Sequence, residues 1–388
     1  MARPEPSWDE DRHDDPAAGL PDATAPPIPL AQRRGGLTMP DGVAPAAARP
    51  AAARRRERRT DIDRAKGLAI LLVVAGHLVA NTAPPGGEWY EPARYLLYRF
   101  HMPFFLYLSG TVVVLSGVLD AEPPDWVRQI RKRAARLLPP FFAIGVLILL
   151  AKLVAMRFVV VDNQPDGLLT GLRHLLWDTG RSPATSIWYL LVLFLCTVAA
   201  LVLRRAIGSG GLLLLGLLLQ LPEVPEIAYL DRFARFFLFF AAGVWVAERQ
   251  DRLLPLMRRW QVLWWALFAA SLGIAMTVWW GVVILNERWS LVVCGLLCIP
   301  ALHGLIRLRP VNGWDWPIAL GRYAMVIYLF NTLAIGAAKA GLILLGIGYT
   351  AANFPLHLAV AMAAGVFVPI LLKRLVLRRV PALDRMTD

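Results

Sequence analysis

Long apolar runs alternate with short charged segments along most of the chain. Runs that reach, or nearly reach, the length of about 20 residues needed to cross a bilayer core occur about ten times. They cover residues 66–84, 95–118, 137–158, 186–204, 208–222, 233–248, 260–282, 289–306, 317–341 and 354–373. This pattern predicts an all-α polytopic membrane protein with about ten transmembrane helices.

Basic residues gather in every second connection between these runs. They precede the first run and follow the second, fourth, sixth, eighth and tenth, whereas the connections between contain fewer Lys and Arg. An excess of Lys and Arg is typical of cytoplasmic loops. We therefore expect an even number of crossings, both termini in the cytoplasm, and a location in the plasma (inner) membrane.

The two ends of the chain differ from the middle. Residues 1–60 are rich in Pro, Ala, Arg and Asp and almost free of aromatic side chains. This composition cannot bury a core, so we expect a disordered cytoplasmic tail there. A transmembrane domain is expected over 61–377 and a short cytoplasmic tail over 378–388. Because the first apolar run follows a long polar stretch, we expect a membrane anchor and no cleaved signal peptide.

Composition agrees with a membrane protein and argues against a nucleic-acid partner. Of the 388 residues 57% are hydrophobic and 18% are charged, with a net charge of +13. Most basic residues lie between apolar runs, which is a topology pattern and not a nucleic-acid surface. Cys196, Cys294 and Cys298 lie within apolar runs. We expect them to pack as small hydrophobic side chains, and we predict neither a metal site nor a disulfide.

The first apolar run contains costly ionisable groups, which makes them functional candidates. Lys66 and His77 are eleven residues apart. They therefore share one helix face, with about 16 Å between their Cα atoms. His77, expected midway along its helix or slightly beyond, has the near-neutral pKa that suits a general base. The alternative is a neutral histidine hydrogen-bonded within a packed bundle. Asp63, three residues before Lys66, can pair with it.

Further basic residues extend this candidate site. Arg64 falls on nearly the opposite helix face from His77, so Lys66 is the better candidate for an anionic ligand. Arg133 and Arg136, just before the third run, could hold an anionic cofactor or could be ordinary cytoplasmic charge.

Other polar and aromatic residues are candidates for the acceptor side. His101 lies near the start of the second run. This run enters the membrane from the side opposite to the first, so His101 could approach His77. Trp188 and Tyr189 could form an interfacial belt or a platform for a sugar ring. Asn331, deep in the ninth run, needs a partner and could join helices or contact substrate.

These residues resemble a known family. Residues 63–77 (DRAKGLAILLVVAGH) resemble the first-helix signature of the membrane-bound acyltransferase-3 family, closest to the branch related to fucose 4-O-acetylases. Residues 100–110 (FHMPFFLYLSG) resemble its second-helix motif, and 133–140 resemble its basic third-helix entry. Residues 188–190 and 321–329 are similar to later landmarks, so the resemblance covers about 60–375.

The resemblance implies transfer of an acyl group, usually acetyl, from cytoplasmic acyl-CoA to a hydroxyl of an extracytoplasmic glycan or lipid-linked sugar. Three positions depart from the family pattern. Lys66 stands where most members have arginine, and a lysine offers a point charge without the planar fork of a guanidinium. Ala324 and Asn331 stand where many members have Ser and His.

Our leading hypothesis is an integral-membrane O-acyltransferase that uses acetyl-CoA and no metal. His77 would act as the general base or as a transient acyl carrier, and His101 would assist at the acceptor side. Asp63 would orient Lys66. The expected donor-binding residues are Lys66, Arg133 and Arg136, and the expected acceptor-binding residues are Trp188, Tyr189 and Asn331.

Two alternatives remain at this stage. A transporter or flippase for a sugar or lipid-linked substrate would have the same helices and scattered polar residues. A membrane scaffold would use the N-terminal tail as a docking segment. Membrane lipid is an expected partner in every case.

Overall fold

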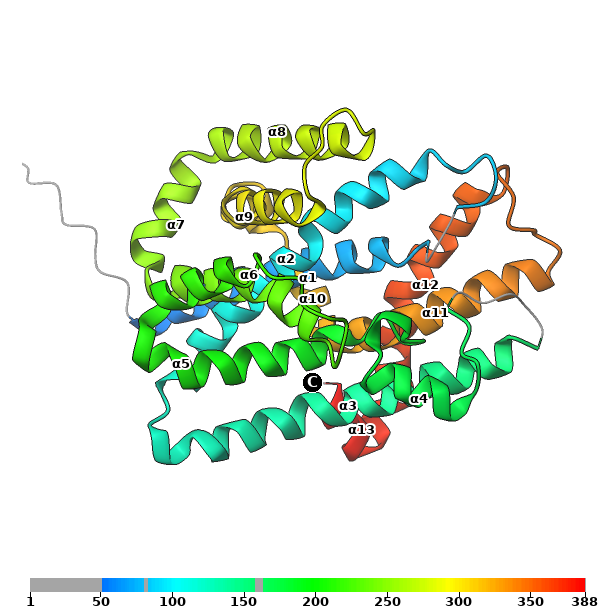
Figure 1. Ribbon diagram of the computed structural model, residues 1–388, viewed down its shortest axis with the longest axis horizontal. Coiled ribbons are helices and arrows are strands. Elements are labelled where there is room, and N and C mark those ends of the chain that lie inside the picture. Colours follow the sequence, from blue (N-terminus) through cyan, green and yellow to red (C-terminus); the bar gives the residue numbers. More distant parts are fainter. Residues whose placement is uncertain (1–50, 80–82, 158–162, 388) are drawn as a thin grey trace, which may run out of the picture. The chain divides into compact units, whose positions relative to one another are not determined.

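The computed structural model describes residues 51–79, 83–157 and 163–387, with side chains described from Thr60 onward (Figure 1). Over these residues the chain forms helices and no strand, apart from one isolated antiparallel bridge between Asp178 and Ile227. The predicted all-α class is confirmed. The helices are α1 (Ala51–Gly76), α2 (Tyr90–Leu115), α3 (Trp126–Ala155), α4 (Leu168–Leu176), α5 (Trp188–Leu218), α6 (Leu230–Glu248), α7 (Gln250–Arg259), α8 (Gln261–Trp279), α9 (Glu287–Ile306), α10 (Trp316–Arg322), α11 (Ala324–Leu344), α12 (Phe354–Leu375) and α13 (Pro381–Met386), with short 3-10 turns between them.

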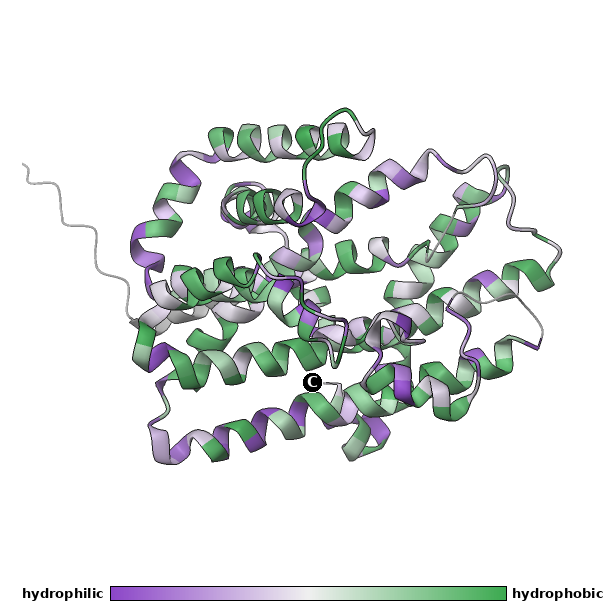
Figure 2. Cartoon of the chain, in the orientation of Figure 1, coloured by the Kyte–Doolittle hydropathy of each residue, from purple (hydrophilic) through white to green (hydrophobic). Residues whose placement is uncertain are grey.

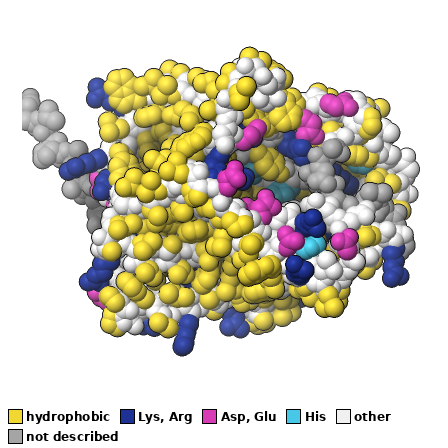
Figure 3. Space-filling model, viewed as in Figure 1, with side chains coloured by type: hydrophobic (Ala, Val, Ile, Leu, Met, Phe, Trp, Pro, Cys, Tyr) yellow, Lys and Arg dark blue, Asp and Glu magenta, His cyan; other side chains and the backbone are white. Residues whose placement is uncertain are grey.

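Six helical spans in the described part of the chain are long and apolar enough to cross a membrane. Large apolar side chains are exposed along several of them, including Val262 on α8 and Phe367 on α12. Figure 2 shows the apolar residues along the helices, and Figure 3 shows hydrophobic side chains over much of this face, with charged side chains at its edges and in its middle. The protein is therefore an integral membrane protein by composition and surface, while the count of about ten crossings stays a prediction. The spans are Pro123–Ala155, Trp188–Leu218, Gln261–Trp279, Glu287–Ile306, Ala324–Leu344 and Phe354–Arg379.

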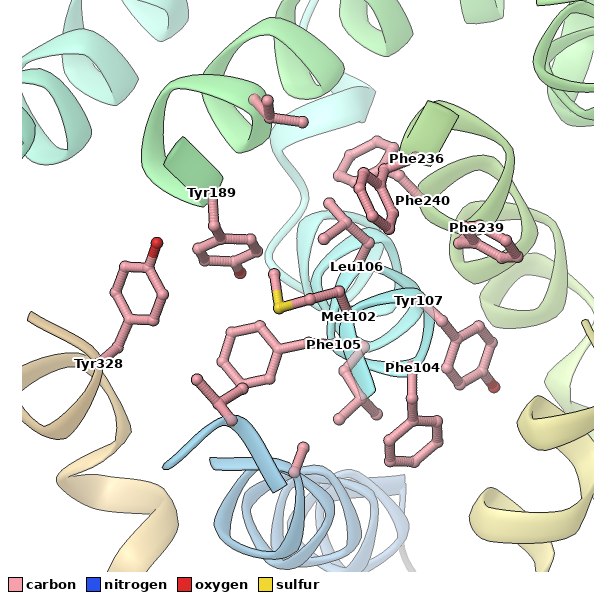
Figure 4. Close-up of a cluster of buried hydrophobic side chains, with 14 of the residues drawn as sticks. Met102, Phe104, Phe105, Leu106, Tyr107, Tyr189, Phe236, Phe239, Phe240 and Tyr328 are labelled. Atoms are coloured by element: carbon pink, nitrogen blue, oxygen red, sulfur yellow. The ribbon is translucent and has the colours of Figure 1, made fainter. Parts of the chain in front are cut away.

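Two long helices that bury charged or polar side chains, α1 and α2, contact several other helices. Helix α2 packs against α1, α5, α6, α8 and α9. Figure 4 shows α2 in the middle, with side chains such as Met102, Phe105 and Leu106 pointing into the spaces between it and its neighbours. A charged or polar side chain on a central helix is shielded from lipid by protein, which is where such groups are tolerated.

Two reciprocal glycine contacts bring α2 and α6 together. A Cβ at Gly110 would collide with the carbonyl oxygen of Phe240, and a Cβ at Gly243 would collide with that of Tyr107. Small residues at a helix interface let backbones approach closely. The backbones of α2 and α6 are therefore in close contact at these two glycines.

Helix α1 is fixed at its start by Arg64, which is almost fully buried. Its Nε donates to the carbonyl of Trp314 at 2.9 Å, and its Nη1 donates to Oδ1 of Asn312 at 3.1 Å. Asp61 adds an ion pair to Arg307 at 2.6 Å. Arg64 therefore ties α1 to the segment after α9 and points away from the face that carries Lys66.

Helix α5 reverses direction at Gly208, whose φ of 65° and ψ of 176° are not helical. Arg204 before the break and Ser209 after it both hydrogen-bond to Glu248, at the end of α6. Trp188, at the other end of the first half, and Gln220, just beyond the second half, both contact residues near the start of α6. The two halves therefore run antiparallel to each other, as expected for separate segments 186–204 and 208–222.

These contacts bring the predicted basic connections to one end of the bundle, which we call the basic end. There Asp61 meets Arg307 at 2.6 Å. Arg204 lies against the end of α6, and Arg133 of α3 donates to Ser116, just after α2, at 3.2 Å. The alternation of basic connections along the sequence is thus matched by their gathering in space.

Several predicted boundaries differ from the structure. Helix α1 ends at Gly76, so the first segment is shorter than 66–84. Helix α3 begins at Trp126, well before 137, because the basic stretch is itself helical. Helix α1 begins at Ala51, inside the predicted tail, whereas residues 1–50 lie outside the described residues. The segment 378–388 contains α13, and Lys373 of α12 donates to the carbonyl of Thr387 at 3.1 Å.

We expect the Gly110→Ala variant to be less stable than the wild type, by about 1–3 kcal/mol, because the added methyl group overpacks the α2–α6 contact. Gly336→Ala on α11 is the control, since nothing lies within 4 Å of a Cβ there. That change should be neutral or stabilise by up to about 1 kcal/mol, because alanine favours helix over glycine. Thermal unfolding of the detergent-purified proteins measures both, and an equal effect of the two changes would contradict the packing argument.

Candidate functional site

The structure brings the backbone beside His77 against the ring of His101. His77 follows directly after the last residue of α1, so the expectation that it lies about midway along its helix is wrong. His101 lies within α2 and is only 2% exposed. A Cβ at Gly76 would lie 3.4 Å from Nε2 of His101. The end of α1 and the middle of α2 thus meet at a histidine pair, as the opposite directions of their segments suggested.

Both imidazoles are held in the same way. Nδ1 of His77 lies 2.7 Å from the carbonyl oxygen of Val73, and Nδ1 of His101 lies 2.8 Å from that of Leu97. A carbonyl oxygen can only accept a hydrogen bond, so each Nδ1 must carry the proton. In the neutral ring this leaves the Nε2 lone pair free, and a free Nε2 is what a general base needs.

Three donors from α2 secure the end of α1. Tyr90 and Tyr98 donate their hydroxyl hydrogens to the carbonyls of Ala75 and Gly76, both at 2.9 Å. Arg94 donates to the carbonyl of Val79 at 3.4 Å. The last carbonyls of a helix have no partner within the helix, so these bonds satisfy groups that lipid could not.

Sequence reasoning missed these donors. The available signal was their spacing of four residues along α2, at 90, 94 and 98, which places them on one helix face together with His101. Tyr98 has two roles, because its ring also packs edge-to-face against His101 with 5.0 Å between centroids.

The three predicted donor-binding cations gather near the basic end. Nζ of Lys66 lies 3.6 Å from Oδ1 of Asp63, so the expected pair is present. Arg136 is close enough to Lys66 and to Arg133 for its charge to act on both. Arg136 is exposed, and the other two are partly exposed. Three cations with one carboxylate beside them, that of Asp63, form a group that is suited to bind an anion.

Tyr189 lies between these cations and the core around α2. Its hydroxyl and Oγ of Ser109 are 2.6 Å apart. Its ring packs against those of Phe105 and Tyr328, with 4.9 and 5.2 Å between ring centroids. Figure 4 shows Tyr189 and Tyr328 side by side. Arg133 and Arg136 are close enough for their charges to act on the Tyr189 hydroxyl. The sequence did not predict this polar contact between Ser109 and Tyr189.

The other predicted acceptor residues lie in the core. The Trp188 ring stacks on Phe236 at 4.9 Å, and Trp188 and Tyr189 are both buried, which does not fit an interfacial belt. Asn331 is fully buried and donates from Nδ2 to the carbonyls of Ile327 and Tyr328, at 3.0 and 2.7 Å. Its Oδ1 has no hydrogen-bond partner among the described residues. An unsatisfied buried amide oxygen has room for a further donor.

The remaining sequence candidates have structural surroundings. The three cysteines are free and buried, as expected for small hydrophobic side chains. Arg64, which helical phase had set aside, is occupied in linking α1 to the segment after α9.

Comparison with known proteins agrees with this arrangement. A family model described as "Acyltransferase domain", that of the acyltransferase-3 family, matches residues 59–374. The nodulation protein NolL of Sinorhizobium fredii is 30% identical over 198 residues, which is 50% of this chain and 50% of that protein. NolL of Mesorhizobium japonicum is 34% identical over 85 residues, 21% of this chain and 22% of that protein.

The chain thus aligns with half or less of the length of these curated relatives. No solved structure matches it. The family match covers most of the chain, and it includes the histidine pair, Asp63 and the three cations. The chain belongs to the acyltransferase-3 family of membrane acyltransferases.

Proposed function

We propose that this protein transfers an acetyl or other short acyl group from cytoplasmic acyl-CoA to a hydroxyl of an extracytoplasmic glycan or lipid-linked sugar. The observation that carries the proposal is the histidine pair, in which each Nδ1 is occupied by a carbonyl and each Nε2 is left as a base. Membership of an acyltransferase family supports the reaction type.

The cation group accounts for the donor. Acetyl-CoA carries several phosphate charges, and Lys66, Arg133 and Arg136 supply positive charge at the end of the bundle that we assign to the cytoplasm. Asp63 restrains Lys66 through its ion pair. The eleven residues from Lys66 to His77 place the two ends of the site about 16 Å apart along α1. An extended donor, with its phosphates at one end and its thioester at the other, suits this separation.

The chemistry follows from the free Nε2. His77 removes the proton of the acceptor hydroxyl, and the oxygen attacks the thioester carbonyl carbon. The new C–O bond forms, the C–S bond breaks, and the proton passes from His77 to the CoA sulfur. His101 serves the acceptor side of the same centre. In the second form of this mechanism Nε2 of His77 attacks the thioester carbonyl carbon, and the C–S bond breaks to release CoA as its thiolate. The acceptor oxygen then attacks the acyl group, the N–C bond to His77 breaks, and the hydroxyl proton passes to the thiolate.

We expect His77→Gln to lower acyl transfer by about 100-fold or more, since general acid–base catalysis contributes about 10²–10⁴-fold. Mass analysis of cell-envelope glycans, with membrane levels of the protein measured in parallel, tests this. His174→Gln is the matched control, because His174 lies on α4 and pairs with Asp178 at 3.7 Å, away from the histidine pair. Normal acylation by a normally expressed His77→Gln protein would overturn the assignment.

We expect Lys66→Met to raise the KM for acetyl-CoA by roughly tenfold to a hundredfold, because a charge-assisted contact contributes about 1.5–3 kcal/mol. Lys66→Arg should recover most of the loss. Lys132→Met, an exposed cation on the same helix as Arg133, is the control. The measurement is transfer of radiolabel from acetyl-CoA in membrane vesicles. The same vesicles also test for transport. If they take up sugar but no acetyl label is transferred to the sugar, a transporter is favoured over an acyltransferase.

A further inference from the structure

The start of α6 places one guanidinium, that of Arg232, next to the surroundings of the histidine pair. Its Cζ lies 5.3 Å from the ring centroid of Trp188 and 5.7 Å from that of Tyr229. It is close enough to Tyr98 for its charge to act on the tyrosine hydroxyl. Tyr98 is the residue that binds the carbonyl of Gly76 and packs against His101. Arg232 therefore lies near Tyr98, which contacts His101 and the backbone just before His77.

Arg232 differs in its partners from the two arginines of α2, Arg94 and Arg99. Arg94 pairs with Glu91 at 2.6 Å, and Arg99 pairs with Glu287. Among the described residues Arg232 forms no hydrogen bond or ion pair, and its contacts are the two aromatic rings. A guanidinium has five N–H donors. Aromatic rings can cover the flat faces of the guanidinium, but they leave the N–H groups along its edge available for hydrogen bonds.

The backbone before α6 holds this guanidinium in place. Ala228 and Tyr229 are consecutive left-handed residues, with φ of 51° and 61°. The N–H of Ala228 donates to the carbonyl of Trp177 at 3.0 Å, and the buried Tyr229 hydroxyl lies 3.3 Å from Oγ of Ser182. Left-handed conformations are unfavourable for side chains with a Cβ, and they persist where surrounding contacts fix them, often at functional sites.

We propose that Arg232 binds an anionic group on the acceptor, a phosphate or a carboxylate, so that this enzyme acylates charged sugars. The inference rests on the proposed acyl transfer. Both anions present paired oxygens that match a guanidinium fork, so the chemistry of recognition is shared. Arg232 also gives the acceptor a cation of its own, distinct from Lys66, Arg133 and Arg136. Two anionic substrates can then occupy the protein together without competing for the same charge.

The first test compares Arg232→Gln with Arg235→Gln, an exposed arginine three residues further along the same helix. Wild-type vesicles acylating their native envelope acceptor from radiolabelled acetyl-CoA are titrated with glucuronic acid, glucose 1-phosphate or glucose. We expect the two anionic compounds, but not glucose, to inhibit the wild type and Arg235→Gln. Arg232→Gln should lose this inhibition and show roughly a tenfold to hundredfold higher KM for the native acceptor. Its KM for acetyl-CoA should be unchanged.

Arg232→Lys separates recognition from folding. It should recover part of the acceptor affinity, because a lysine keeps the charge without the fork. Equal inhibition of the wild type by all three sugars, or a wild-type acceptor KM in Arg232→Gln, would overturn the inference. If Arg232→Gln fails to accumulate, Arg232→Lys and the wild-type inhibition pattern decide the question.

The second test identifies the acylated molecule by mass analysis of envelopes with and without the protein. A phosphate on the acylated unit indicates a lipid-linked sugar, and a carboxylate indicates an acidic glycan. An acylated neutral sugar would overturn the role of Arg232 and leave the proposed acyl transfer standing. Absence of any acylated molecule in the presence of the wild-type protein would overturn the proposed function itself.

Discussion

The site depends on how the end of one helix is satisfied inside the protein. Helix α1 stops at Gly76, and its last carbonyls lack the partners that a further turn of helix would provide. Tyr90 and Tyr98 on α2 provide the missing donors. The same contacts fix His77 just beyond the helix and set the ring of His101 beside it. The helix end that α2 caps is thus also one side of the candidate site.

The arrangement of layers follows from the same constraint. Helices α1 and α2 bury polar side chains such as Arg64, His101 and Thr111, while spans such as α8 and α12 expose apolar side chains outward. Polar groups then contact protein, where partners are available, and lipid meets side chains that need none. The central position of α2 lets one helix serve both the histidine pair, through Tyr98, and Tyr189, through Ser109.

The sequence predicted the features that depend on local pattern. Apolar length and charge gave the helical class and the gathering of basic connections, and helical phase correctly separated Lys66 from Arg64. The position of His77 along its helix was mispredicted because the end of α1 is set by side chains of α2, and hydropathy continues smoothly past Gly76. Helix α3 was predicted too short because Arg128 to Arg136 are polar yet helical. The Ser109–Tyr189 contact and the position of Arg232 pair residues far apart in sequence, so no local pattern contains them.

The paired glycine contacts between α2 and α6 have a consequence for motion. Gly110 packs against the backbone at Phe240, and Gly243 packs against the backbone at Tyr107. The two helix backbones are therefore in close contact at two nearby points. Such an interlock resists both sliding and rolling, because either movement drives backbone into backbone. Tyr98 lies on α2 and Arg232 lies on α6. The distance between them is therefore fixed before any substrate binds. Any helix movement that admits substrates would then involve helices that contact one another through flexible side chains, and not the α2–α6 pair.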